Sequence, residues 1–146
     1  MKRLTVHAAC VCLVLAVIGS AGCAAVLVAG GAAAGAGVVY WVEGALRTTL
    51  GYPIRSVHDA TVQSLKDLSI GIVADKTESF SGEIESALRG GSNVRVYLKA
   101  VSSTATEVTI RIGVFGDKAQ SEMVLNAIEQ RLKNTSAAAA QKLSGA

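Results

Sequence analysis

The sequence predicts a two-layer α+β domain, in which an antiparallel sheet of four to five strands carries two helices on one face. Two observations lead to this fold class. Several stretches after Glu43 alternate apolar and polar residues, which is the pattern of strands with one covered face. Two other stretches repeat apolar residues at spacings of three and four, which indicates amphipathic helices. The predicted order of elements is β-α-β-β-β-β-α.

The first strand and the first helix are expected on either side of Pro53. Residues 44–51 place Leu46, Thr48 and Leu50 on one side of an extended chain. The stretch PIRSVHDATVQSLKDL follows, and its leading proline is compatible with the first turn of a helix. We expect the buried stripe of this helix to contain Ile54, Val57, Thr61, Leu65 and Leu68.

The next four strands are expected to form an antiparallel meander. A short strand at residues 70–73 precedes a second one within residues 80–89. The glycine pair at residues 90–91 is a strong hairpin signal between that strand and the next. The side chains expected to point inward from the last three strands are Phe80, Ile84, Leu88, Val94, Val96, Leu98, Ala100, Val108, Ile110, Ile112 and Val114.

The second helix is expected to begin after Asp117, whose side chain can cap it. Gln120 lies three residues further on and completes the sequence of a capping box. Residues 133–146 are small and polar, and we expect them to be disordered. The folded domain is therefore expected to span residues 43–132. The buried stripe of its second helix is expected to contain Met123, Val124, Ala127, Ile128 and Leu132.

The N-terminal segment has the features of a signal peptide. Lys2 and Arg3 precede the apolar run LVLAVI, as in a secretory signal. The small residues GSAG then lead directly to Cys23, in a pattern that resembles the lipobox of bacterial lipoproteins, although Ser20 stands where leucine is usual. In a lipobox the cysteine thiol receives a diacylglycerol, and the acylated cysteine becomes the new N-terminus. We expect a signal peptide at residues 1–22 and lipidation of Cys23; the alternative is an ordinary signal peptide.

The cysteine count supports lipidation. The chain has three cysteines, and Cys10 and Cys12 lie within the predicted signal peptide. The remaining one cannot form an internal disulfide. Without Lys2 and Arg3 the basic residues fall from 14 to 12 against 11 acidic ones, so the mature chain has a net charge near +1. This balance gives no reason to expect a nucleic-acid partner.

Residues 24–42 are rich in glycine and alanine and carry no charge. No Gly-Lys-Ser/Thr follows them, which excludes a phosphate-binding loop. One interpretation is a flexible tether, or a segment lying on the membrane surface, because glycine disfavours helix in water. The other is a membrane-inserted or self-associating helix, since the GAAAG spacing permits close packing and Tyr40-Trp41 suits a membrane interface.

The chain resembles a family of bacterial lipoproteins catalogued as domain of unknown function 3568. The matching pieces are Cys23 with its Gly/Ala run, the stretch VHDATVQSLKDLSI, and the stretch TEVTIRIGVFGDKAQSEMVLNAI. Within the last of these, IRIGVFGD is the most specific part. The resemblance covers nearly the whole chain up to Leu132 and implies a location and a fold, but no activity.

The sequence offers no catalytic or metal-binding constellation. His58 is the only histidine outside the predicted signal peptide, and its neighbour Asp59 points about 100° away on a helix, so we expect His58 to be a surface residue. Glu83 and Glu85 are better explained by ion pairs with cations of the next strand than by glycosidase chemistry. With neither a second histidine nor a spare cysteine, we expect no metal, no cofactor and no enzymatic activity.

The outer face of the predicted sheet is the candidate partner-binding surface. Helices are expected on the other face, which leaves an aromatic residue among cations, and tyrosine and arginine are enriched at interfaces. We expect a membrane-anchored protein that faces the periplasm and binds another envelope protein or supports envelope structure. The alternative is a small-ligand-binding or enzymatic domain, which would need a deep pocket on the sheet. The candidate surface consists of Arg95, Tyr97, Lys99, Thr109 and Arg111.

Ala24 bears on which membrane carries the lipid. An aspartate directly after the lipidated cysteine favours retention in the inner membrane of many Gram-negative bacteria. Because alanine occupies this position, we expect the outer membrane.

Overall fold

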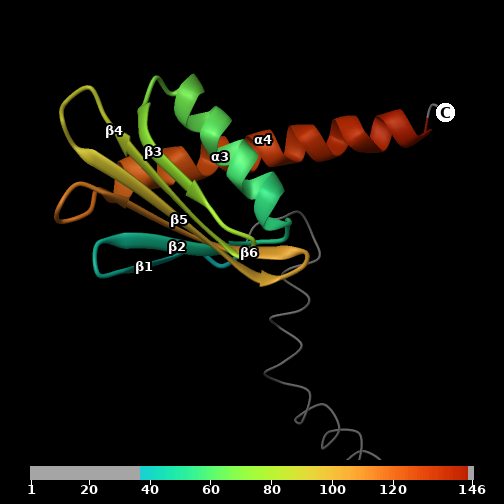
Figure 1. Ribbon diagram of the computed structural model, residues 1–146, viewed down its shortest axis with the longest axis horizontal. Helices are drawn as coiled ribbons and strands as arrows, with labels where there is room; N and C mark the ends of the chain where they lie inside the picture. The colour runs from blue at the N-terminus through green and yellow to red at the C-terminus, as the bar shows by residue number, and fades with distance from the viewer. Residues whose placement is uncertain (1–36, 145–146) are drawn as a thin grey trace, which may run out of the picture. The chain divides into compact units, whose positions relative to one another are not determined.

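A computed structural model describes residues 37–144, which form two helices and one six-stranded sheet (Figure 1). The predicted signal peptide, Cys23 and residues 24–36 lie outside the described residues. In chain order the elements are β1 (Tyr40–Val42), β2 (Ala45–Leu50), α3 (Ile54–Asp67), β3 (Gly71–Thr77), β4 (Ser81–Ala87), β5 (Asn93–Ser102), β6 (Ala105–Ile112) and α4 (Lys118–Ser144).

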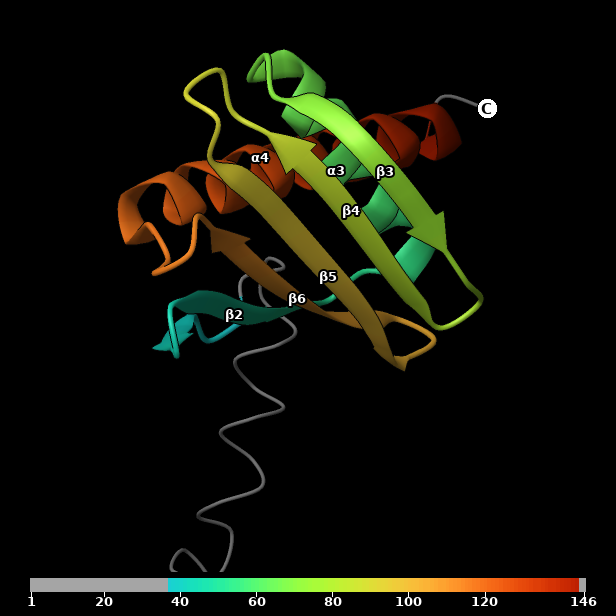
Figure 2. The same cartoon turned by 60° about the vertical axis from the view of Figure 1, so that its left-hand side comes forward.

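The sheet is antiparallel throughout, with strand order β1-β2-β6-β5-β4-β3. Strands β3 to β6 form the predicted meander, whereas β2 joins its far end by pairing with β6. Helix α3 connects β2 to β3, which lie apart in the sheet, and therefore crosses the sheet. Both helices lie on the same face, and within residues 37–144 the other face carries no helix (Figure 2). The predicted two-layer α+β fold is confirmed.

Strand β1 is an element that the sequence pattern did not predict, so the sheet has six strands instead of four to five. The sequence places its residues in the Gly/Ala-rich tether. In the structure they pair with β2, with Tyr40 opposite Arg47 and Val42 opposite Ala45. The two-residue turn between them has positive φ at both positions, 51° at Glu43 and 75° at Gly44. Such a turn matches the twist of paired strands. The folded domain therefore begins before Glu43.

Helix α3 buries the predicted face. Val57, Thr61 and Leu65 are fully buried, and Ile54 and Leu68 pack against the core from its margin. The Val57 N–H donates to the Pro53 carbonyl, so the helix begins directly after the proline. The Thr61 hydroxyl donates to the Val57 carbonyl at 2.7 Å, which satisfies its polar group inside the core.

Strands β4, β5 and β6 show the predicted alternation, with Ile84, Val96 and Ile110 among the fully buried side chains. Two inward predictions at strand ends are wrong. Phe80 is 76% exposed because it lies in the turn before β4 begins. Val114 is 78% exposed because β6 ends at Ile112 and the chain turns at Gly113, whose φ is 73°.

Helix α4 has the predicted cap. The Gln120 N–H donates to Asp117 Oδ1 at 3.0 Å, and Gln120 Nε2 donates to Asp117 Oδ2 at 2.8 Å. These hydrogen bonds, with the backbone one first, lower the pKa of the Asp117 carboxyl. The prediction that Met123 is buried is wrong. Its side chain is 46% exposed, because the buried residues of α4 recur at spacings of three and four that pass it by. The stripe consists of Ser121, Val124, Leu125, Ile128 and Leu132.

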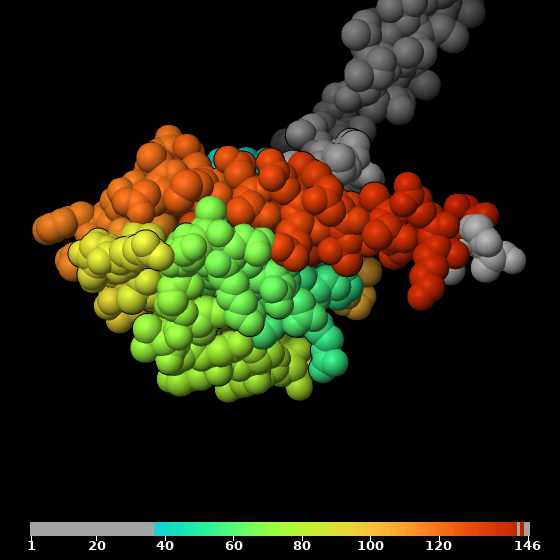
Figure 3. Space-filling view, turned by 90° about the horizontal axis from the view of Figure 1, so that it is seen from above, coloured from blue at the N-terminus to red at the C-terminus, as the bar shows by residue number. Residues whose placement is uncertain are grey.

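Helix α4 also continues beyond the predicted end of the domain. Residues 133–144 were expected to be disordered, but they extend the helix to Ser144. Alanine at residues 137–140 is the best helix former and explains this continuation. No buried residue lies beyond Leu132 within the described chain. Figures 1 and 3 show the last turns of α4 extending past α3 and the sheet.

Candidate partner-binding surface

We call the helix-free side of the sheet the outer face. Its side chains alternate with the buried ones, and strand register aligns them in rows across the sheet. Three of the rows join β5 to β6: Arg95 lies opposite Arg111, Tyr97 opposite Thr109, and Lys99 opposite Glu107. The structure therefore brings the five predicted surface residues together on one face.

Tyr97 occupies the middle of the outer face and is 39% exposed. It lies between Glu83 of β4 and Thr109 of β6. Partial burial, followed by the hydrogen-bonded carboxylate of Glu83, raises the pKa of the Tyr97 phenol. The hydroxyl therefore stays protonated at neutral pH, with the ring half open to contact.

The acidic residues of β4 are explained by their neighbours. Glu85 Oε1 lies 3.6 Å from Arg95 Nε, and both side chains are about half exposed. Glu83 instead lies opposite Tyr97. An exposed ion pair contributes little to stability, so Arg95 keeps a solvent-facing guanidinium that a partner can reach.

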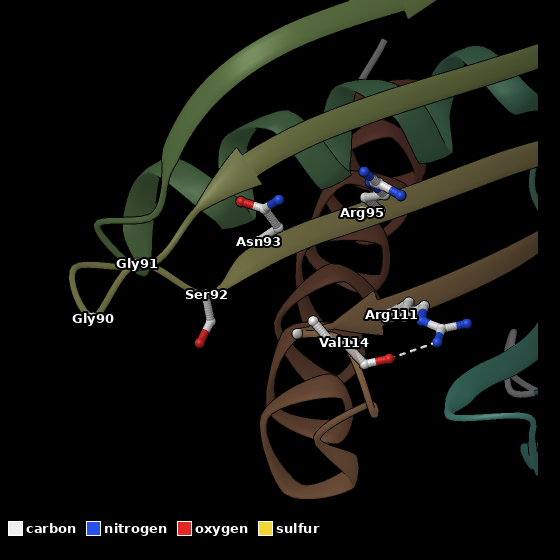
Figure 4. Close-up of a pocket in the computed structure, with 8 residues that line it drawn as sticks. Gly90, Gly91, Ser92, Asn93, Arg95, Arg111 and Val114 are labelled. Atoms are coloured by element: carbon white, nitrogen blue, oxygen red, sulfur yellow. Dashed lines mark hydrogen bonds between the residues drawn. The ribbon is translucent and has the colours of Figure 1, made fainter.

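Arg111 makes two contacts with loop backbone that the sequence pattern did not predict. Its Nη2 donates to the Val114 carbonyl at 2.6 Å (Figure 4). Its Nη1 donates to the Glu43 carbonyl at 3.4 Å. The side chain thereby ties the β1–β2 turn to the loop between β6 and α4. Arg111 is a residue that positions this loop, as well as a cation at the border of the outer face.

The β1–β2 turn and the β6–α4 loop also meet through their backbones. A Cβ atom at Gly116 would overlap the Gly44 carbonyl oxygen, and one at Gly44 would overlap the Phe115 carbonyl oxygen. Both glycines have positive φ, 75° and 86° for Gly44 and Gly116. Only residues without a side chain allow this approach.

This packing presents two apolar side chains to solvent. Val114 is 78% exposed and Phe115 is 92% exposed. We call residues 114–115 the apolar tip. The sequence pattern does not predict the tip. Val114 continues the inward alternation of β6, and no pattern singles out Phe115. The signal was present in the flanking glycines, Gly113 and Gly116, which end the strand and bend the chain.

A shallow hollow of about 500 Å³ separates the apolar tip from the β4–β5 turn. The hollow is open to solvent, and Figure 4 shows Arg95, Arg111 and Val114 along one side with the β4–β5 turn along the other. Directly opposed like charges on neighbouring strands disfavour each other. A negatively charged group in the hollow would offset the repulsion between the two arginines. The lining residues are Gly90, Gly91, Ser92, Asn93, Arg95, Arg111, Gly113 and Val114.

His58 is not the surface residue that the sequence suggested. Its side chain is only 15% exposed, and Nε2 lies 2.8 Å from Asp75 Oδ1 and 2.9 Å from Thr77 Oγ1. Nδ1 lies 3.5 Å from Asp59 Oδ1. The imidazole therefore links α3 to the edge strand β3.

No group of three or more histidine, cysteine, aspartate or glutamate side chains within residues 37–144 is placed to hold a metal ion. Over the same residues, neither helix is long and apolar enough to span a membrane.

The sequence matches a known protein family. The family described as "Protein of unknown function (DUF3568)" matches residues 6–131. A search of curated proteins found nothing similar to this chain. The matched segment includes the whole sheet, helix α3 and the part of α4 up to residue 131. This chain belongs to the DUF3568 family.

Proposed function

We propose that this protein is a lipid-anchored, non-enzymatic envelope protein that binds another envelope protein through the outer face of its sheet. The anchor is the lipidated Cys23, which follows a signal peptide at residues 1–22. Two or more acyl chains hold a protein stably on a membrane, whereas one gives only marginal binding. The domain faces the periplasm, and Ala24 favours the outer membrane.

The observation that carries the proposal is the uneven covering of the sheet. Both helices lie on one face, and the outer face exposes Tyr97 between Arg95 and Lys99 of the same strand. A rigid aromatic side chain with arginine nearby is the composition found at protein interfaces. Contact through this face would leave the core and both helices unchanged.

The shape of the outer face favours a protein over a small ligand. Small-molecule sites enclose most of the ligand surface, but the hollow between the apolar tip and the β4–β5 turn is open to solvent. Its lining includes arginines and small polar residues, without a carboxylate or a histidine. This lining supports recognition of a negatively charged protein surface more than chemistry on a substrate.

Photo-crosslinking in living cells tests the proposal. A photoreactive amino acid replaces Tyr97 in the full-length chain, and a second variant carries it at Gln63, which is exposed on α3. We expect a discrete protein adduct from position 97 and none from position 63. Equal labelling from both positions, or labelling from position 63 alone, would exclude the outer face as the main contact.

The anchor is tested separately by mass spectrometry of the mature N-terminal peptide. We expect Cys23 as the first residue, with a diacylglyceryl group on its sulfur. An unmodified cysteine, or cleavage at another position, would refute the anchor while leaving the proposed binding face open to its own test.

A further inference from the structure

We propose that the apolar tip makes the central apolar contact of the interface. Phe115, supported by Val114, inserts into an apolar pocket of the partner protein. A partner carboxylate beside that pocket enters the hollow next to Arg95. This inference rests on the proposed function and specifies the chemistry of the partner.

Exposure of the tip is the first argument. Phe115 is 92% exposed and Val114, the residue before it, is 78% exposed. The molecule has two phenylalanines, and the other one, Phe80, is exposed at the opposite end of the sheet. An apolar pair that is mostly exposed to solvent gains from burial in a partner.

Rigidity of the tip is the second argument. Arg111 donates to the Val114 carbonyl at 2.6 Å, which fixes the backbone of the tip from the sheet side. The contact between Gly44 and Gly116 fixes it from the side of the β1–β2 turn. An exposed side chain on a backbone that is already ordered loses little conformational entropy on binding. Aromatic anchors at interfaces profit most from such preorganisation.

The tip and the entry point of the anchoring segment lie at opposite ends of β2. Gly37 lies against the backbone of Thr49, near the end of β2, whereas the tip lies against Gly44, before the start of β2. Residues 1–36 therefore join the domain at the end of β2 that is remote from the tip. The length of β2 separates these points by roughly 20 Å.

Charge specifies the second part of the partner surface. Val114 belongs to the apolar tip and also lines the hollow, which places the hollow directly beside the tip. Arg95 and Arg111 lie opposite each other there, and the ion pair between Arg95 and Glu85 is long and exposed. A partner carboxylate would accept hydrogen bonds from Arg95 without displacing the loop contact of Arg111.

The test measures how the yield of the adduct from the photoreactive residue at position 97 depends on other exposed residues of the full-length chain. Phe115→Ala is expected to reduce adduct yield about tenfold, and Phe115→Leu to retain most of it. Phe80→Ala is the matched control, because it removes the other exposed phenylalanine, and it is expected to leave the yield unchanged. Arg95→Glu is expected to reduce the yield several-fold. The abundance of each variant in the membrane fraction is measured as well, so that adduct yields are compared at equal protein levels.

The outcomes separate the two proposals. No adduct from the photoreactive residue at position 97, in a chain with no other change, would refute the proposed binding face itself. A normal adduct whose yield is equal in Phe115→Ala and Phe80→Ala would overturn the role of the apolar tip alone. A photoreactive group at position 115 that labels phospholipid instead of protein would also overturn it, in favour of a tip that enters a membrane.

Discussion

Gly44 and Gly116 lie so close that a side chain on Gly116 would occupy the position of the Gly44 carbonyl oxygen. The contact joins the first hairpin of the domain to the loop before its last helix. Two segments from opposite ends of the fold thus hold each other in place, and each depends on a residue with positive φ. Stability and the presentation of the apolar tip are therefore coupled at this contact.

Gly116→Ala is expected to destabilise the protein by about 2–4 kcal/mol, because it adds a backbone clash to an unfavourable φ. The measurement is chemical unfolding of the purified full-length protein. Gly90→Ala is the control, since a Cβ atom there would meet nothing within 4 Å. Its free energy of unfolding should change by less than about 1 kcal/mol. Similar losses for the two variants would contradict the close contact.

Ile110→Asp is expected to prevent folding. Ile110 is fully buried in β6 between Val96 and Leu46 of the neighbouring strands, and an unpaired charge there costs about 4 kcal/mol or more. Thr109→Asp, one residue away on the outer face, should retain the fold. A fragment of residues 37–144 should show the same contrast in a thermal unfolding scan, because it contains every buried residue of the core. Cooperative melting of Ile110→Asp near the parent temperature would refute the assignment of faces.

Acid should weaken the start of α4. The pKa of Asp117 is lowered in the folded protein, so the ionised carboxylate stabilises the fold above the unfolded pKa. This contribution is lost as the pH falls through the lower, folded pKa. Asp117→Asn keeps a hydrogen-bond acceptor but cannot ionise. We therefore expect the difference in free energy of unfolding between the wild type and Asp117→Asn to shrink as the pH falls from about 5 to about 2. This range includes the ordinary pKa of aspartate and the lower pKa of Asp117. A difference that stays constant over this range would show that Asp117 contributes no pH dependence.

His58→Ala should loosen the edge strand β3 from α3. The imidazole contacts Asp75 and Thr77, both on β3, and loss of such hydrogen bonds costs about 1–2 kcal/mol. Hydrogen exchange followed by mass spectrometry should show faster exchange of residues 71–77 in the variant than in the wild type. The increase should be smaller in the centre of the sheet. Gln63→Ala, at an exposed position of the same helix, provides the comparison and should leave the exchange of β3 unchanged.

The parts of the fold that the sequence predicted are those where one physical pattern dominates. Strands β5 and β6 alternate over their length because one face is buried and the other is solvated. Helix α3 shows its buried spacing for the same reason. Asp117 and Gln120 predicted a cap because the hydrogen bonds that form a cap are local in sequence.

The missed features depend on contacts that are distant in sequence. Strand β1 is too short to show a period and is ordered by pairing with β2. His58 finds its partners only when α3 packs beside β3. The apolar tip follows an unbroken alternation in β6, and what turns Val114 outward is the loop that starts at Gly113. Of the candidate surface, the residues on β5 could be assigned from alternation, whereas the loop contacts of Arg111 required the tertiary structure.

The length of α4 beyond Leu132 has a practical consequence. Residues 133–144 form a helical arm of roughly 18 Å, estimated from the helical rise, and the described side chains along it bury nothing. Limited proteolysis in this arm should therefore trim the protein to a product that ends near Leu132 and melts at the same temperature as the intact chain. A reporter protein fused after Ser144 would be attached at the far end of this arm, roughly 18 Å from the last buried turn of α4.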